Sequence, residues 1–252
     1  MNIRPALLLA AALSIVACSR RPAQPEFKPL SVDTLLTRNG NSCHVDFLFL
    51  SIGNKEKSPV LQNIEQANIG YFFQLENFQG PAEEGVAASL GEILANYLPE
   101  DNGPQGGQYD ISADSEVSVL DSLLCYVITR AGYTGGAHGM YGTECHTYSL
   151  NDGFELSLAD LFSETELRCL DILIREKIAA RYNATTDEEL TQAGFFPEYI
   201  APTENFRLSP EGITFFYNPY DIGCYALGAV EVTVLRSELE ARKRGESETP
   251  EP

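Results

Sequence analysis

Alternation of apolar and polar residues predicts one strand early in the chain. Within residues 43–52 (CHVDFLFLSI), the side chains of Val45, Phe47 and Phe49 fall on one side of an extended chain. The intervening positions are more mixed in polarity. We therefore expect a strand with one face buried.

Two helices are predicted after this strand. Ser58 followed by Pro59 is typical of a helix start, since serine caps the first turn and proline fits its first position. Apolar residues follow at helical spacing, at Val60, Ile64, Ala67 and Tyr71. A second helix is expected over residues 83–98, with acidic residues in its first turn and an apolar face of Val86, Leu90, Ile93 and Tyr97.

The middle of the chain is rich in strand-forming residues. Residues 101–109 are a loop, and residues 115–130 predict one long strand, with a buried helix as the alternative. Residues 142–150 predict another strand. The Asn151-Asp152-Gly153 sequence then indicates a hairpin turn.

A helix and three short strands complete the pattern. Ser163 and Glu166 form a capping box, and the following helix has an apolar face of Leu167, Leu170, Ile174 and Ile178. Residues 206–208, 213–217 and 230–235 predict short strands separated by turns.

These elements indicate an α+β fold with antiparallel sheets, packed helices and two sub-domains. We expect an N-terminal sub-domain over residues 30–132 and a C-terminal one over residues 133–241. Residues 242–252, which are charged and contain prolines, are expected to form a disordered tail.

The N-terminus predicts export and a lipid anchor. Residues 1–17 have a basic start and a short apolar run, as in a cleaved signal peptide. The Ile-Val-Ala-Cys sequence ending at Cys18 resembles a bacterial lipobox, so Cys18 is expected to carry the lipid; the alternative is an ordinary secretory signal. Residues 18–29 would tether the domain to the membrane. Ser19 lacks the aspartate associated with retention at the inner membrane, which favours the outer membrane and a periplasmic orientation.

Charge narrows the range of partners. The chain has 17 basic and 36 acidic residues, a formal net charge of −19, and the signal removes only one further basic residue, Arg4. Such a chain repels nucleic acid and attracts cationic partners. The alternative is that the charge serves solubility.

Motifs for cofactor, metal or covalent chemistry are missing. The five cysteines after Cys18 form no CxxC pair, and the three histidines have no metal-ligand spacing. We therefore expect no cofactor, no metal site and no catalytic residue.

One glycine-rich segment is a candidate contact site. Residues 132–139 (GYTGGAHG) contain four glycines and His138 between two predicted strands. Glycines permit positive φ and close backbone approach, so the loop could contact another surface. The alternative is a hairpin corner in which His138 bonds a neighbouring carbonyl.

This loop carries a family resemblance. Residues 134–138 (TGGAH), the strand end at 147–150 and residues 153–162 (GFELSLADLF) closely resemble the centre of an exported bacterial family, domain of unknown function 3298. A second domain, numbered 4163, usually precedes it. Residues 212–222, including the proline-tyrosine turn at Pro219-Tyr220, resemble the closing strands of that family.

The resemblance implies a two-part α+β fold and a binding role. The same pair of domains is similar to the extracellular region of RsiV-type anti-sigma factors, which bind lysozyme, and to the non-catalytic part of PdaC-type deacetylases. This sequence has no deacetylase metal motif, and Cys224 stands where the family would have a non-thiol residue, which implies a local disulfide. The residues expected to contact a ligand are Tyr133, Gly135, Gly136, His138, Gly139 and Tyr220.

The sequence thus predicts a non-catalytic, lipid-anchored envelope protein that binds a protein or cell-wall ligand, with lysozyme as the specific candidate. Two alternatives remain open. One is a structural or assembly lipoprotein with an exposed apolar patch. The other is a peptidoglycan-modifying enzyme centred on His138.

Overall fold

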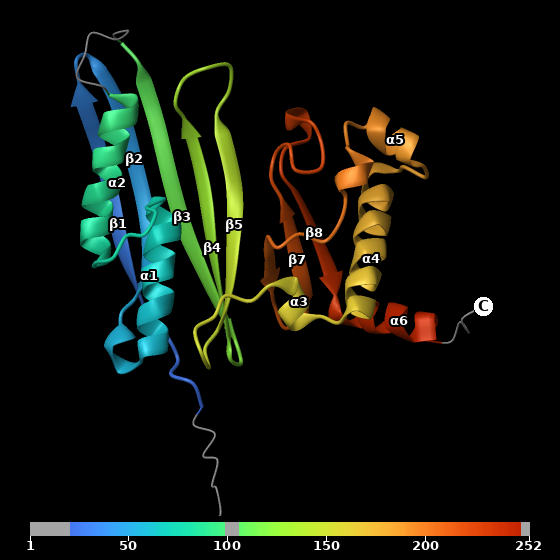
Figure 1. Ribbon diagram of the computed structural model, residues 1–252. Helices are drawn as coiled ribbons and strands as arrows, with labels where there is room; N and C mark the ends of the chain where they lie inside the picture. The colour runs from blue at the N-terminus through green and yellow to red at the C-terminus, as the bar shows by residue number, and fades with distance from the viewer. Residues whose placement is uncertain (1–20, 99–105, 248–252) are drawn as a thin grey trace, which may run out of the picture.

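The computed structural model describes residues 21–98 and 106–247, and it contains two sheets side by side (Figure 1). The larger sheet has the strand order β1-β2-β3-β4-β5. Only β2 and β3 pair in parallel; the other neighbours are antiparallel. The strands are β1 (Phe27–Arg38), β2 (Asn41–Ile52), β3 (Gln108–Leu120), β4 (Leu123–Tyr133) and β5 (Met140–Ser149).

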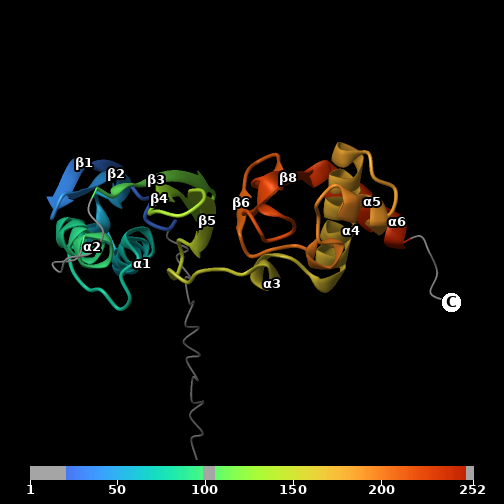
Figure 2. The ribbon, with the colours of Figure 1, turned by 90° about the horizontal axis from the view of Figure 1, so that it is seen from above.

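Two helices cover one face of the larger sheet, α1 (Pro59–Phe73) and α2 (Ala82–Tyr97). Figure 2 shows both helices on the same side of β1–β3. Ser58 caps α1 by accepting from the amide of Val60 at 3.2 Å, and Pro59 occupies the first turn, as predicted. The 3-10 turn Lys55–Lys57 precedes this cap.

The buried face of α1 differs from the prediction. Leu61, Ile64 and Phe72 point into the core, whereas Tyr71 is 37% exposed. The sequence has apolar residues on two adjacent stripes, and the spacing alone could not identify the one that meets the sheet.

The predicted long strand over residues 115–130 is a hairpin made of β3 and β4. The chain reverses at Asp121, which has a φ of 53°. Aspartate tolerates this left-handed conformation. The turn contains neither glycine nor proline, so no strong local signal marks it in the sequence.

The second sheet has the order β6-β7-β8, with β6 (Phe206–Leu208), β7 (Gly212–Tyr217) and β8 (Val230–Leu235). The long helix α4 (Glu164–Tyr182) packs on one face of this sheet and buries Cys169, Leu170, Leu173, Ile174 and Ile178. Ser163 and Glu166 form the predicted capping box. The remaining elements are α3 (Leu158–Leu161), α5 (Asp187–Gln192), α6 (Arg236–Ser247) and the 3-10 turns Pro197–Tyr199 and Tyr225–Leu227.

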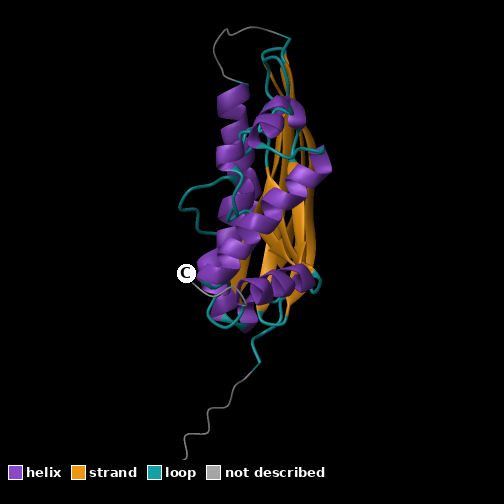
Figure 3. Ribbon diagram, turned by 90° about the vertical axis from the view of Figure 1, so that its right-hand side faces the viewer, coloured by secondary structure: helices purple, strands orange, loops and turns teal. Residues whose placement is uncertain are grey.

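The α+β class with packed helices is confirmed, and the sheets are antiparallel as predicted except for the parallel pair β2–β3. Viewed from the side (Figure 3), the strands form one layer beside the helices. The boundary between residues 132 and 133 is wrong, because it separates β4 from its partner β5. The first core extends to Leu150 and the second begins at Leu158.

Two terminal assignments also change. Residues 27–29, predicted as tether, are the first residues of β1, and residues 242–247, predicted as disordered tail, continue α6. The signal and Cys18 lie outside the described residues. Within the described ranges, no helix is both long and apolar enough to cross a bilayer.

The strand register places the start of β1 far from the β4–β5 loop. Tyr133 is level with Asp110, His44 and Leu35, whereas Phe27 lies at the opposite end of β1. At about 3.3 Å per residue, the two levels are about 26 Å apart along the strands. The N-terminal segment therefore leaves one end of the sheet, and the glycine-histidine loop lies at the other (Figure 1).

Candidate binding site

The glycine-histidine loop connects β4 to β5 at the end of the larger sheet. Gly135 and Gly136 have φ angles of 97° and 95°, which residues with side chains rarely adopt. Tyr133 is 42% exposed, and its hydroxyl donates to the carbonyl of Gly136 at 3.0 Å. The loop is therefore a tight hairpin corner rather than a free segment.

His138 fastens this corner to the second sub-domain. Its Nδ1 lies 2.9 Å from the carbonyl of Gly139, so this nitrogen carries the proton and donates. The imidazole also stacks on Tyr225, with ring centroids 3.9 Å apart and planes at 24°. The Tyr225 hydroxyl donates to the same Gly139 carbonyl at 2.7 Å. The structural alternative from the sequence, a histidine bonded to a neighbouring carbonyl, is thus confirmed.

Two further tyrosines gather around Tyr225. Their rings lie 6.2 Å (Tyr141) and 5.6 Å (Tyr220) from it, and their exposed fractions are 41% and 52%. We call these four residues the aromatic cluster: His138, Tyr141, Tyr220 and Tyr225. It joins the end of the large sheet to the loop between β7 and β8, and it presents aromatic surface to solvent.

Tyr220 holds an unfavourable backbone conformation. In the turn Asn218-Pro219-Tyr220-Asp221, the amide of Asp221 donates to the carbonyl of Asn218 at 3.0 Å, and the φ of Tyr220 is 78°. This geometry suits glycine at the third position of the turn. A tyrosine there costs about 1 kcal/mol or more, and strain of this kind concentrates at functional sites.

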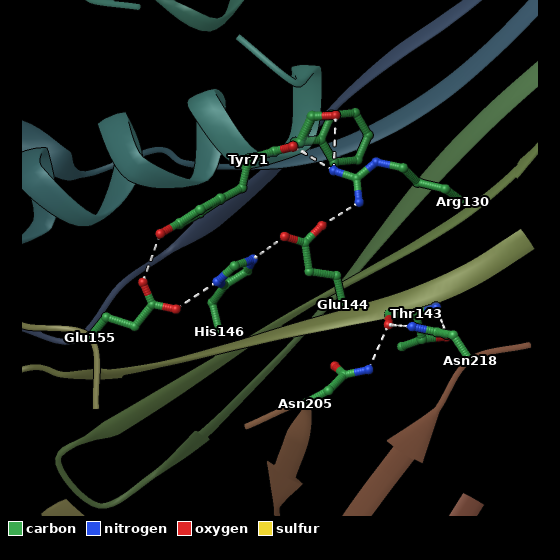
Figure 4. Close-up of polar contacts among 9 residues, drawn as sticks. Tyr71, Arg130, Thr143, Glu144, His146, Glu155, Asn205 and Asn218 are labelled. Atoms are coloured by element: carbon green, nitrogen blue, oxygen red, sulfur yellow. Dashed lines mark hydrogen bonds and ion pairs between the residues drawn. The ribbon is translucent and has the colours of Figure 1, made fainter. Parts of the chain in front are cut away.

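The same turn seals the edge of β5. The side chain of Asn218 accepts from the Thr143 amide at 2.7 Å and donates to the Thr143 carbonyl at 2.9 Å, as a neighbouring strand would. Asn205 donates to the same carbonyl at 2.8 Å (Figure 4). A Cβ at Gly142 would lie 3.0 Å from the Asn218 oxygen, so a glycine lets the amide approach. These contacts fix the two sheets relative to each other and thereby hold the aromatic cluster in place.

A ring of polar contacts lies between α1 and the strands β4 and β5 (Figure 4). His146 Nδ1 lies 2.7 Å from Glu155, and its Nε2 lies 3.2 Å from Glu144 at an ion-pair distance without good hydrogen-bond alignment. Arg130 contacts Glu144 at 2.5 Å and donates to the backbone carbonyl of Tyr71. The Tyr71 hydroxyl donates to Glu155 at 2.9 Å, which closes the ring.

The ring favours the charged form of His146. Burial acts to lower the pKa of His146, but the carboxylates of Glu144 and Glu155 outweigh it, so the pKa is raised. The contact with His146 in turn lowers the pKa of Glu144. Burial, followed by the bond to Glu155, raises the pKa of Tyr71 to about 12. This ring was not predicted from the sequence, and its one local signal is the Glu144–His146 spacing on a single strand face.

The described cysteines and acidic groups form neither a disulfide nor a metal site. Cys43, Cys125, Cys145 and Cys224 are free thiols, so the disulfide expected at Cys224 is wrong. Within residues 21–98 and 106–247, no group of three or more histidine, cysteine or carboxylate side chains is arranged to hold a metal ion.

Comparison with known proteins decides the family of the second sub-domain. Residues 159–237 match the family model described as protein of unknown function (DUF3298). This segment is a DUF3298 domain. A crystal structure of a DUF3298 family member from Bacteroides fragilis superposes with a TM-score of 0.73 and 26% identity, over 88% of this chain and 94% of that one.

A second solved structure shows the same fold. A DUF3298 family protein from Pseudomonas aeruginosa has a TM-score of 0.61 and 17% identity, over 88% of this chain and 95% of that chain. No curated protein matches the chain at a significant level.

The DUF3298 domain contributes only part of the site. Tyr220 and Tyr225 belong to it, whereas Tyr133, Gly135, Gly136, His138 and Gly139 precede the matched residues. Tyr225 contacts His138, Gly139 and Tyr220 and so brings these predicted residues together. Tyr133 contacts Gly136 instead. Tyr225 was not predicted as a site residue, because no sequence pattern relates it to a loop so far upstream.

Proposed function

We propose that this chain is a non-catalytic, lipid-anchored protein of the cell envelope that binds a protein ligand, with lysozyme as the specific candidate. The observation that carries this proposal is the aromatic cluster, which is fixed between two sheets at the end of the molecule opposite Phe27. A lipid at Cys18 would leave this end facing away from the membrane. We place the chain at the outer membrane, facing the periplasm.

Exposed tyrosines suit protein recognition. Tyrosine contributes large contact area with few rotatable bonds and is enriched among residues that dominate binding energy. The Tyr225 ring is held by its stack with His138 and by its bond to Gly139, so little side-chain entropy remains to be lost on binding. Preorganisation of this kind favours specific binding over non-specific association.

Charge supports a cationic partner. The net charge of −19 accelerates encounter with basic proteins such as lysozyme. Charge alone gives weak binding that salt removes, because exposed charges are screened over about 10 Å at 0.1 M salt. A specific complex must therefore keep much of its affinity at physiological salt.

A peptidoglycan-modifying enzyme receives less support from the histidines. Nδ1 of His138 donates to a backbone carbonyl rather than to a carboxylate, and its ring is stacked on Tyr225. His146 is 6% exposed, and both of its ring nitrogens face carboxylates. Nε2 of His138 keeps its lone pair, but no carboxylate among the described residues orients this imidazole, and both nitrogens of His146 are already engaged.

The test is binding of the mature chain, carrying Cys18→Ser so that no lipid is attached, to a c-type lysozyme across a salt series. Another basic protein serves as the control. We expect sub-micromolar affinity for lysozyme at physiological salt and weak, salt-sensitive binding of the control. Equal release of both proteins by salt would show that only charge attracts them.

Two variants locate the contact. Tyr220→Ala should weaken lysozyme binding about tenfold or more, as for a central aromatic residue of an interface. Phe154→Ala is the matched control, because Phe154 is 71% exposed and lies in the turn at the opposite end of β5. If neither variant changes the affinity, the cluster is not the contact surface. If lysozyme does not bind, a structural or assembly role, or a cell-wall ligand, replaces this proposal.

A further inference from the structure

A cleft on the helix-covered face opens beside the glycine-histidine loop. It has a volume of about 800 Å³ and lies between the last turns of α2, the residues that follow α1, and the sheet. Thr134, Met140 and Tyr141 form its rim at the β4–β5 hairpin. The cleft is thus continuous with the aromatic cluster through Tyr141.

Aromatic side chains form much of the cleft wall. The rings of Phe47, Phe72 and Phe73 are buried, pack edge to face with centroids 4.9 to 5.9 Å apart, and form the base of the cleft. The rings that a ligand can contact are those of Phe78, Tyr97 and Tyr141, which are partly or largely exposed. Aromatic faces attract cations, Arg and Lys side chains above all, with energies of about 0.5–2 kcal/mol. The aromatic residues that line the cleft are Phe47, Phe72, Phe73, Phe78, Tyr97 and Tyr141.

The electrostatic balance of the cleft is negative. Glu76 and Glu92 line it, both are exposed, and neither forms an ion pair with any described residue. Arg130 also lines it, but its charge is met by Glu144 and by backbone carbonyls at the end of α1. The carboxyl-terminal ends of α1 and α2 both border the cleft, and a helix C-terminus carries a partial negative charge.

We propose that this cleft binds a basic side chain, with its guanidinium or ammonium group between Glu76 and Glu92 and its alkyl stem against the aromatic wall. The side chain belongs to the protein partner, so this inference rests on the proposed function for its source. A guanidinium fits best, because its plane can stack on a ring while its edge meets a carboxylate. An apolar ligand would leave the two carboxylates without a counter-charge.

Met140 provides a direct reporter. It lines the cleft and is the one methionine of the sequence besides Met1, so a chain labelled with ¹³C-methyl methionine and lacking its initiator residue has a single methyl signal. We would titrate the mature Cys18→Ser chain with capped arginine, Nα-acetyl-arginine methylamide. The comparison ligand is capped citrulline, which has nearly the same shape without the charge.

The expected result is a saturable shift of the Met140 signal with capped arginine at millimolar concentrations and none with capped citrulline. Glu76→Gln with Glu92→Gln should weaken the arginine response about tenfold. The matched control, Glu56→Gln with Glu188→Gln, removes the same charge from exposed sites outside the cleft and should leave the response unchanged. An equal response to both ligands, no response, or equal weakening by both double variants would overturn the proposal.

Lysozyme titrated into the same labelled chain separates this inference from the proposed function. A shift of the Met140 signal that disappears in the Glu76→Gln, Glu92→Gln variant supports both. If capped arginine binds and lysozyme does not, the proposed cation site is supported and lysozyme is not the partner. If lysozyme binds without affecting Met140, the partner stands and the cleft is not part of its interface.

Discussion

The phenol ring of Tyr71 lies flat on the imidazole of His146, with centroids 3.8 Å apart and planes 14° apart. Tyr71 belongs to the last turn of α1 and His146 to β5, so this stack joins the helix layer to the edge of the large sheet. Arg130 fastens the same turn by donating to two of its carbonyls. The end of α1, which borders the proposed cation site, is therefore held by charged groups rather than by apolar packing alone.

The protonation of His146 should make stability depend on pH. Because the contacts with Glu144 and Glu155 raise its folded-state pKa above 6.5 despite burial, the protonated form is the stabilising one. This stability is complete below the unfolded pKa and is lost as pH rises through the folded one. Urea unfolding from about pH 6 to about pH 9 should show the free energy falling across that interval.

Two histidine variants identify the group responsible. His146→Gln should flatten the fall in stability, since the titrating group is gone. His44 also lies between two carboxylates, Asp33 and Asp110, but its side chain is 45% exposed and solvent screens its pairs. His44→Gln should therefore leave the pH dependence nearly intact. If the free energy of unfolding of His146→Gln still falls with pH, the pH dependence comes from a group outside the ring of polar contacts.

Removing the Tyr71 hydroxyl should weaken the ring of polar contacts without removing the stack of Tyr71 on His146. Tyr71→Phe loses the 2.9 Å bond to Glu155 and is expected to cost about 1 kcal/mol in the free energy of unfolding. Tyr71→Ala also loses the stacked ring, so it should cost about 1 kcal/mol more. Tyr199→Phe is the control, because Tyr199 is 63% exposed. Equal costs for Tyr71→Phe and Tyr199→Phe would contradict a stabilising role for the hydroxyl.

Asn218 should be needed to hold the two sheets together. Asn218→Ala leaves the outward amide of Thr143 without its partner, while Asn205 still donates to the carbonyl. We expect a loss of about 1–3 kcal/mol, and faster amide hydrogen exchange at Thr143 than at β4 positions. Asn63→Ala, at an exposed position of α1, is the control. Unchanged exchange at Thr143 would show that the side-chain contact is not maintained in solution.

Local patterns explain which elements the sequence could predict. The capping box at Ser163 and the strands β7 and β8 depend on neighbouring residues, and they occur where they were expected. The β3–β4 turn at Asp121 was missed because its left-handed residue is not a glycine. Tyr71 and Glu155 are 84 positions apart, and their contact depends on packing of α1 against β5, which no periodicity specifies.

The candidate site was predictable only in part, for the same reason. The glycine content of residues 132–139 predicted a contact role for the loop, and the Pro219-Tyr220 turn was predicted through the family resemblance. Tyr225 reaches Gly139 from 86 positions away. The cleft depends on the ends of two helices meeting one sheet face, an arrangement that exists only in three dimensions.

Replacing Tyr220 by glycine should change stability and binding in opposite directions. Glycine adopts a φ of 78° without steric cost, so Tyr220→Gly relieves the strain in the turn. We expect the free energy of unfolding to rise by up to about 1 kcal/mol. The greater conformational entropy that glycine gives the unfolded chain reduces this gain. The same change removes a half-exposed aromatic surface beside Tyr225 and should weaken lysozyme binding about tenfold. Tyr220→Ala removes the ring but keeps the strain, so it should lose affinity without gaining stability. If Tyr220→Gly is less stable than Tyr220→Ala, the positive φ is not a source of strain, and strain no longer supports a binding role for this tyrosine.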